Sequence, residues 1–353
     1  MGNQSMDNRR VALCYTILIP LFIISALTAI GTGSTYIGWP TILRVAGAKL
    51  LPAGWIATAG VTRADTVIVW LIRVPRVIVA GFVGMGLAAA GAVMQALFRN
   101  PLAEPALVGT GSGAVLGAVT AFVTGWSIRS VVSVPLAAMA GAFIALIVVY
   151  AIATRGGVTP LGTLLLAGIA VTSLLAAVSS LLLSVNIVNW QIAQEILFWT
   201  MGGLDARSWT HVWLCAPFVV LGMLAAIVQA RDLDLLQQGE ESAAALGLDI
   251  EGSKRVLALT AAMLTGACVA VSGMIGFVGL VIPHAVRLVL GPANRRLLPA
   301  CGLTGATFLI LCDLAARTIH PPVEIRLGVI TALLGGPIFI ALLMRRYRDV
   351  SAS

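Results

Sequence analysis

The sequence predicts an all-α, polytopic membrane protein with about ten transmembrane helices, and composition and run length lead to this fold class. Hydrophobic residues form 59% of the 353-residue chain and charged residues only 10%, whereas about a quarter of a soluble protein is charged. Apolar runs of about 20 residues, the length that crosses a bilayer core, recur along the chain. The buried core of a soluble helical protein is the weaker alternative, because so many runs reach spanning length.

Ten apolar segments are expected to span the membrane as helices. In chain order they cover residues 11–30, 77–97, 107–123, 131–153, 161–185, 211–230, 256–275, 277–290, 298–316 and 327–344. The first is long for the apolar region of a secretory signal peptide and lacks a small-x-small cleavage site, so we expect it to be retained. The eighth is short and follows the seventh almost directly. Together the segments form a single membrane domain over residues 1–353.

Basic residues outside the spans orient the chain. Arg9 and Arg10 precede the first span, and Arg345, Arg346 and Arg348 follow the last. Because cytoplasmic loops are rich in arginine and lysine, both termini are predicted to be cytoplasmic. The long first outer loop, expected to include the arginines just before the second span, counts little toward orientation. Cytoplasmic arginines in contact with anionic lipid explain most of the net charge of +8, so no nucleic acid partner is needed.

The two halves of the chain are weakly similar. Gly91 lies ten residues before Pro101, and Gly273 lies ten residues before Pro283. By the span count, the first copy starts outside and the second starts inside. We therefore predict an inverted repeat of spans two to five and seven to ten, as in other transporters.

No residue set for catalysis or metal binding is visible in the sequence. The glycines of GTGSG at residues 109–113 lack the following Lys-Ser or Lys-Thr of a phosphate-binding loop, so ATP is expected on a separate subunit. His211, His284 and His320 have no partners at metal-ligand spacing. The five cysteines are scattered through apolar segments, as buried structural thiols are. A membrane enzyme or receptor is therefore disfavoured.

Asp313 is the carboxylate that we place well inside a span, and it bears on whether the protein is an ion-coupled secondary transporter. An isolated carboxylate within the membrane would favour an ion-coupled secondary transporter. Arg317 follows four residues later on the same helix face, so a structural ion pair within the helix is at least an equal explanation.

Residues 231–255, RDLDLLQQGEESAAALGLDIEGSKR, form a long charged stretch expected on the cytoplasmic side. Leucines and alanines recur in it at helical spacing, and a turn at Gly247 ends the expected short helices. The stretch is either a solvated loop or a pair of coupling helices that dock in a groove of an ATPase, as amphipathic helices do.

Three segments resemble a known family. They are RVPRVIVAGFVGMGLAAAGAVMQALFRNPLAEPALVGTGSG at 73–113, VSGMIGFVGLVIPHAVRLVL at 271–290 and LCDLAARTIHPPVEIRLGVITALLGGP at 311–337. They closely resemble the FecCD-like permease subunits of ATP-driven importers for iron-siderophores, heme and vitamin B12. The resemblance implies a homodimer, two cytoplasmic ATP-binding cassette subunits and a periplasmic substrate-binding protein. It also implies a place in the bacterial inner membrane, in contact with membrane lipid.

The resemblance also implies roles for residues at both membrane faces. Arg73, Arg76 and Arg317 match arginines that dock the acidic lobes of the binding protein, although anchoring to lipid phosphate would suit each of them alone. Asn100 and Leu102 match a constriction at the cytoplasmic gate. A plain turn after the second span, forced by the neighbouring prolines, is the alternative.

Within residues 231–255, the family pattern GExxAxxLG is present as Gly239-Glu240, then Ala243 or Ala244, then Leu246-Gly247. The matched residues, which would couple the ATPase to transport, are Glu240, Ala244, Leu246 and Gly247.

One segment bears on the substrate. EILFWTMGGLDARSW at 195–209 resembles heme permeases more than vitamin B12 permeases, so heme is ranked first, iron-siderophore second and vitamin B12 third. Arg207 can offer a heme propionate a charge-assisted contact, although a solvated loop position explains this residue at least as well. No permanently bound cofactor is expected, because heme or an iron chelate is cargo and ATP binds the partner subunit.

Overall fold

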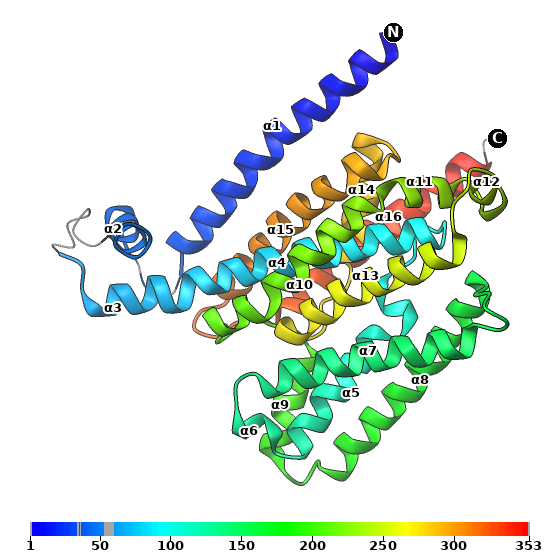
Figure 1. Ribbon diagram of the computed structural model, residues 1–353. Helices are drawn as coiled ribbons and strands as arrows, with labels where there is room; N and C mark the ends of the chain where they lie inside the picture. The colour runs from blue at the N-terminus through cyan, green and yellow to red at the C-terminus, as the bar shows by residue number, and fades with distance from the viewer. Residues whose placement is uncertain (1, 34, 36, 53–59, 352–353) are drawn as a thin grey trace.

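The computed structural model describes residues 2–33, 35, 37–52 and 60–351, and its regular elements there are helices (Figure 1). In chain order they are α1 (Gly2–Gly31), α2 (Trp39–Leu50), α3 (Arg63–Thr66), the π-helix η1 (Val67–Arg73), α4 (Val74–Leu97), the 3-10 helix η2 (Pro105–Val108), α5 (Thr110–Val123), α6 (Trp126–Arg129), α7 (Ser133–Ala153), α8 (Leu161–Val185), α9 (Trp190–Thr200), α10 (Trp209–Val228), α11 (Ala230–Gln237), α12 (Glu240–Ala245), α13 (Ile250–Ser272), α14 (Val278–Leu290), α15 (Asn294–Thr318) and α16 (Leu327–Ser351). The side chains of Arg345, Arg346 and Arg348 lie outside the described residues, so the orientation that rests on them stays a prediction.

The ten predicted spans are confirmed as helices. Seven helical stretches of the described chain are long and apolar enough to cross a membrane, and three shorter apolar stretches, in α5, α14 and α16, complete the set. The second span differs most from its prediction, because the helix begins at Arg63 and runs for 35 residues to Leu97. Arg73 and Arg76 therefore lie within a continuous helix and not in the outer loop. They continue the helix because their side chains find acceptors inside the protein.

Helix α4 lies at the centre of the bundle, where α10, α13, α14 and α15 surround it. In its most apolar window 83% of the residues are buried, against 11% in α1 and 22% in α8. Glycines let the backbones touch. A Cβ on Gly84 would collide with the carbonyl of Gly305 in α15, and a Cβ on Gly91 would collide with the backbone of Gly279 in α14. Such close approach favours helix association in bilayers, where lipid tails are as apolar as leucine.

The order of helix lengths agrees with the predicted inverted repeat. Helices α4, α5, α7 and α8 contain 24, 14, 21 and 25 residues, and α13, α14, α15 and α16 contain 23, 13, 25 and 25. A short second helix thus recurs in each half. The matching Gly–Pro spacings in the sequence do not mark equivalent positions in the two halves of the structure. Gly91 lies inside α4, whereas Gly273 follows the last residue of α13.

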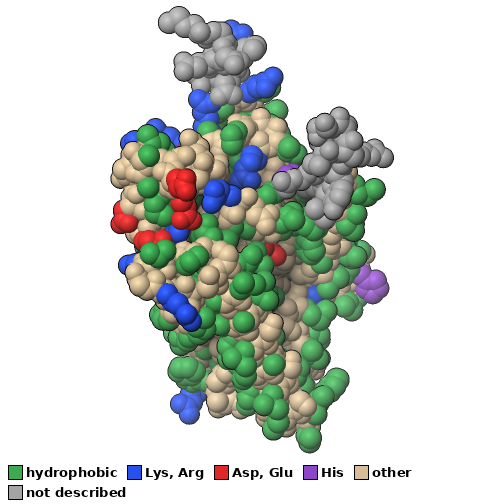
Figure 2. Space-filling view, turned by 90° about the vertical axis from the view of Figure 1, so that its right-hand side faces the viewer, with side chains coloured by type: hydrophobic (Ala, Val, Ile, Leu, Met, Phe, Trp, Pro, Cys, Tyr) green, Lys and Arg blue, Asp and Glu red, His purple; other side chains and the backbone are tan. Residues whose placement is uncertain are grey.

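The two ends of the bundle carry different elements. Helix α1 begins and α16 ends where α11 and α12 lie, which we call the α12 side, and α2, α6 and α9 lie at the opposite end, the α9 side (Figure 1). Figure 2 looks onto the α12 side and shows acidic and basic side chains gathered over part of that face, with apolar side chains prominent elsewhere. The chain therefore starts and finishes on one side, as an even number of spans requires.

We expect Gly91→Ala to destabilise the membrane domain by about 1–3 kcal/mol, a typical effect of overpacking, because the added methyl meets backbone that cannot rotate away. Gly162→Ala is the matched control, since Gly162 is also helical and its added Cβ meets nothing within 4 Å. Thermal unfolding of both variants in the same lipid nanodiscs measures the difference. Equal melting temperatures would contradict a structural role for the contact between α4 and α14.

Candidate functional site

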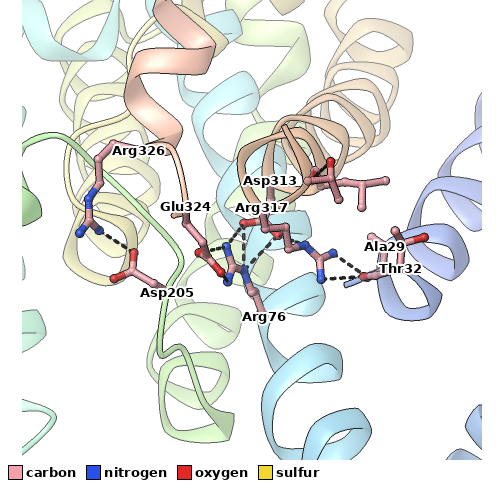
Figure 3. A network of polar contacts seen from close by, with 10 residues as sticks. Ala29, Thr32, Arg76, Asp205, Asp313, Arg317, Glu324 and Arg326 are labelled. Carbon is pink, nitrogen blue, oxygen red and sulfur yellow. Dashed lines mark hydrogen bonds and ion pairs between the residues drawn. The ribbon is translucent and has the colours of Figure 1, made fainter. Parts of the chain in front are cut away.

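A buried ion network joins α4 to α15 on the α9 side (Figure 3). Arg76 donates from Nε to both Asp313 oxygens at 3.0 and 3.1 Å and from Nη2 to Asp313 Oδ1 at 2.9 Å. It also donates to Glu324, in the connection from α15 to α16, from Nη1 at 3.0 Å and from Nη2 at 2.9 Å. The side chains of Arg76 and Asp313 are 9% and 1% exposed. One guanidinium therefore holds two carboxylates that are distant in sequence from it.

Two further arginines hold the end of α1. Arg317 donates to the carbonyls of Thr32, at 3.1 Å, and Ala29, and its Nε lies 3.5 Å from Asp313 Oδ2. Arg73 donates from Nη1 to the carbonyls of Ile30 and Gly31, both at 3.1 Å. The last carbonyls of a helix have no partner within the helix, and these side chains supply the missing donors.

The network gives the three predicted docking arginines internal partners. Arg73 and Arg76 are buried as whole residues, and the Arg317 side chain is 7% exposed. Docking to a binding protein stays a prediction for them, and each already has a structural role within the chain. The predicted pair of Asp313 and Arg317 is confirmed. Sequence reasoning missed Arg76 as the main partner of Asp313, because no local pattern joins residues so far apart.

A pocket of about 300 Å³ opens on the α9 side, beside the network. It is lined by Phe122, Glu195, Phe198, Trp199, Gly203, Asp205, Arg207, Ser272 and Arg326. Arg326 donates to Asp205 Oδ1 at 2.8 Å and lies 4.1 Å from the centre of the Phe198 ring. Arg207 lines the pocket and donates from Nε to the carbonyl of Val271. The pocket therefore combines aromatic walls with two guanidinium groups.

Asp205 stays charged in this pocket. Burial acts to raise its pKa, but the charge and hydrogen bond of Arg326 outweigh burial, and the pKa lies below its ordinary value. The ion pair is therefore intact at neutral pH. It ties the connection before α10 to the start of α16. Sequence reasoning missed this pair, since Asp205 and Arg326 come from opposite halves of the chain.

The turn after α4 has the predicted break. Helix α4 ends at Leu97, and Arg99 takes a left-handed backbone with φ of 50°. The side-chain oxygen of Asn100 accepts a hydrogen bond of 3.0 Å from the backbone of Leu102, a residue that is 39% exposed. A turn at the end of the span is thus confirmed, and its use as a gate stays a prediction.

The charged connector forms two short helices, α11 and α12, as predicted. Ala243 faces the core with no exposed surface, whereas Ala244 is exposed and Leu246 is 62% exposed. Gly247 ends the segment with φ of 82°. Ala243, which stands at the alanine position of the sequence pattern, packs inward, whereas the predicted coupling residue Ala244 lies on the outer surface. We call the exposed apolar residues Ala244, Ala245 and Leu246 the α12 patch.

Comparisons with known proteins place the chain in a family. A model described as the FecCD transport family matches residues 21–345. The chain belongs to the FecCD transport family. Its relatives include the cobalamin import permease BtuC of Halobacterium salinarum, 46% identical over 87% of this chain and 82% of the relative. The hemin transport permease HmuU of Yersinia pestis is 40% identical over 79% of this chain and 84% of the relative.

Two further matches cover nearly the whole chain. The vitamin B12 import permease BtuC of Escherichia coli is 36% identical over 98% of both chains. A solved structure described as an inward-facing conformation of a metal-chelate type ABC transporter matches with a TM-score of 0.82 and 28% identity, over 95% of this chain and 99% of that one. The FecCD chain is thus the multi-pass permease subunit of an ABC importer. It is not catalytic, and ATP hydrolysis belongs to a separate subunit.

These relatives favour the vitamin B12 alternative over heme, which the sequence ranked first. The ranking rested on the segment FWTMGGL at 198–204. In the structure this segment packs against its own chain: Gly203 donates to the carbonyl of Ser272 at 2.8 Å, and Leu327 donates to the carbonyl of Gly202 at 3.1 Å. Its glycines serve close backbone contacts, so its sequence is a poor indicator of cargo.

We expect Arg76→Gln to destabilise the permease by about 3–5 kcal/mol, because buried Asp313 would lose its main partner. Glu324→Gln should cost about 1 kcal/mol or less, since the Glu324 side chain is 41% exposed. Thermal unfolding and folded yield of the purified membrane domain compare the two variants. An Arg76→Gln protein that keeps its melting temperature and loses only binding-protein affinity would show that docking is the main role of Arg76.

Proposed function

We propose that this FecCD permease carries a corrinoid of the cobalamin class into the cell, with energy from ATP hydrolysed by its partner subunit. The proposal depends on this chain's similarity to two cobalamin permeases. One is 46% identical, and the other aligns over 98% of both chains. Hemin is the second candidate, supported by the 40% identical hemin permease. The position of Arg207 in the α9-side pocket also supports it, because a propionate suits a guanidinium there.

The proposed assembly follows from the two ends of the bundle. The α12 side faces the cytoplasm, and the α12 patch docks one of two ATPase subunits. The α9 side faces a substrate-binding protein outside the cytoplasmic membrane. Two copies of the permease form a homodimer, and the turn at Asn100 and Leu102 lies on the cytoplasmic side of the pathway. The arrangement is supported by charged residues gathered on the α12 side (Figure 2) and by the exposure of Ala244 and Leu246.

Uptake by reconstituted importer distinguishes the candidate cargoes. The permease, its ATPase and its binding protein would be placed in proteoliposomes loaded with ATP, and uptake of labelled cyanocobalamin, hemin and a ferric siderophore compared. We expect ATP-dependent uptake of cyanocobalamin that unlabelled hemin does not inhibit. Uptake of hemin alone would favour the second candidate. Uptake driven by an ion gradient without ATP would contradict the whole proposal.

We expect Leu246→Glu to weaken assembly with the ATPase about tenfold or more, because a charge would enter the centre of an apolar contact. Gln238→Glu is the matched control, since Gln238 is also exposed and adds the same charge next to α12 but outside the α12 patch. Co-purification of the ATPase with each variant gives the readout. Equal recovery of ATPase from both variants would show that the ATPase docks at another part of the permease.

A further inference from the structure

Lys254 is an ammonium with no exposed surface on the α12 side of the permease. Its Nζ donates to the carbonyl of Thr159 at 3.1 Å, to Glu240 Oε2 at 2.9 Å and to Glu251 Oε1 at 2.9 Å. An ammonium has three N–H donors, so all of them are used. The three acceptors come from three elements: the connection from α7 to α8, the first residue of α12, and the first turn of α13.

The connection from α7 to α8 is itself a closed turn. Arg155 and Val158 exchange two backbone hydrogen bonds at 3.0 and 3.1 Å, and the hydroxyls of Thr154 and Thr159 lie 2.8 Å apart. Glu251 Oε2 accepts from the backbone of Thr159 at 2.9 Å. We therefore expect the whole turn to move with Thr159. Because α8 begins at Leu161, two residues further along the chain, the start of α8 should move as well.

Apolar packing alone holds α12 weakly. Ala243 is the buried residue of this six-residue helix, and an alanine offers little contact area. The ion pair from Glu240 to Lys254 adds a directional link. A fully buried lysine is rare unless it is paired, and an apolar side chain of similar volume is often as stable or more so. A charge at this buried position therefore fits a need for a specific connection better than a need for stability.

We propose that Lys254 is a positioning residue that transmits movement of α12 to the turn between α7 and α8. The inference rests on the proposed docking of the ATPase at the α12 patch. When the ATPase displaces α12, Glu240 pulls on the ammonium, and the ammonium pulls on the carbonyl of Thr159. Helix α8 then moves at its cytoplasmic end. ATP hydrolysis is coupled to transport through this polar link.

The test measures the number of cargo molecules transported per ATP hydrolysed in the reconstituted importer. Lys254→Met removes the ammonium and keeps the length of the side chain. The ratio should fall about tenfold or more, because all three hydrogen bonds of the ammonium are lost and one hydrogen bond that involves a charged group already accounts for about that factor. Arg295→Met is the control, because Arg295 is an exposed basic residue at the start of α15 on the same side, whereas Arg255 donates to Gly157 in the turn under test. The ratio of the control variant should match that of the unaltered protein.

A second variant guards against simple misfolding. Glu240→Gln weakens one link, because the ion pair to Lys254 becomes at most a neutral-acceptor hydrogen bond, and leaves Lys254 paired with Glu251. The Glu240 side chain is 37% exposed, so the fold should tolerate the change. The ratio should fall in this variant too. A merely structural role would lower folded yield, ATPase rate and uptake in parallel and leave the ratio unchanged.

Spin labels at Ser242 on α12 and Val158 in the turn, both exposed, give an independent readout. ATP binding should shift both labels in the unaltered complex and only the Ser242 label in Lys254→Met. Unchanged transport ratios in Lys254→Met and Glu240→Gln would overturn the inference about Lys254. Failure of the unaltered permease to assemble with the ATPase would instead overturn the proposed function.

Discussion

Contact between glycine backbones around α4 is the constraint on which the rest of this structure depends. Within a bilayer, side-chain hydrophobicity does not drive helices together, so affinity must come from close packing and from polar contacts. Gly84 and Gly91 bring α15 and α14 against the centre of α4. With α4 fixed at these two heights, Arg76 at its start lies beside Asp313, and the turn that follows Leu97 is placed at the opposite end of the bundle.

Buried ion pairs and hydrogen bonds hold the helix ends together. On the α9 side, the guanidinium groups satisfy helix-terminal carbonyls and hold carboxylates from distant segments. On the α12 side, one ammonium gathers the ends of three elements. Arg76 and Lys254 are buried and have carboxylate acceptors in place, the condition under which a buried ion is tolerated. The apolar middle of the bundle therefore sets the distances between helices, and the charged ends determine which segments move together.

The sequence was sufficient for those features that depend on neighbouring residues. Hydropathy predicted the spans because each reaches membrane length within itself, and the pair of Asp313 and Arg317 was predictable because four residues make one helix turn. The partnership of Arg76 with Asp313 was not predictable, because it joins positions 237 residues apart. Arg73 and Arg76 looked like loop residues because their charges interrupt the hydropathy pattern, and only the folded structure shows the acceptors that let the helix continue.

The candidate site also combines features that neighbouring residues predict with features that depend on distant parts of the chain. The connector was predictable as short helices from its leucine and alanine spacing. Lys254 looked like part of a solvated loop, since its burial depends on a turn 95 residues earlier. The identity of the cargo depends on the pathway as a whole, and a short stretch of aromatic and glycine residues reports mainly on packing.

The cap on α1 has a consequence for the order in which the protein is made. Helix α1 is apolar enough to enter the bilayer as soon as it is synthesised, but the donors for its last carbonyls arrive much later. Arg73 follows Ile30 by 43 residues, and Arg317 follows Ala29 by 288. During biosynthesis these carbonyls must be hydrated by water at the membrane surface. The end of the first helix is thus secured in two steps, by Arg73 early in synthesis and by Arg317 only after synthesis of the ninth span.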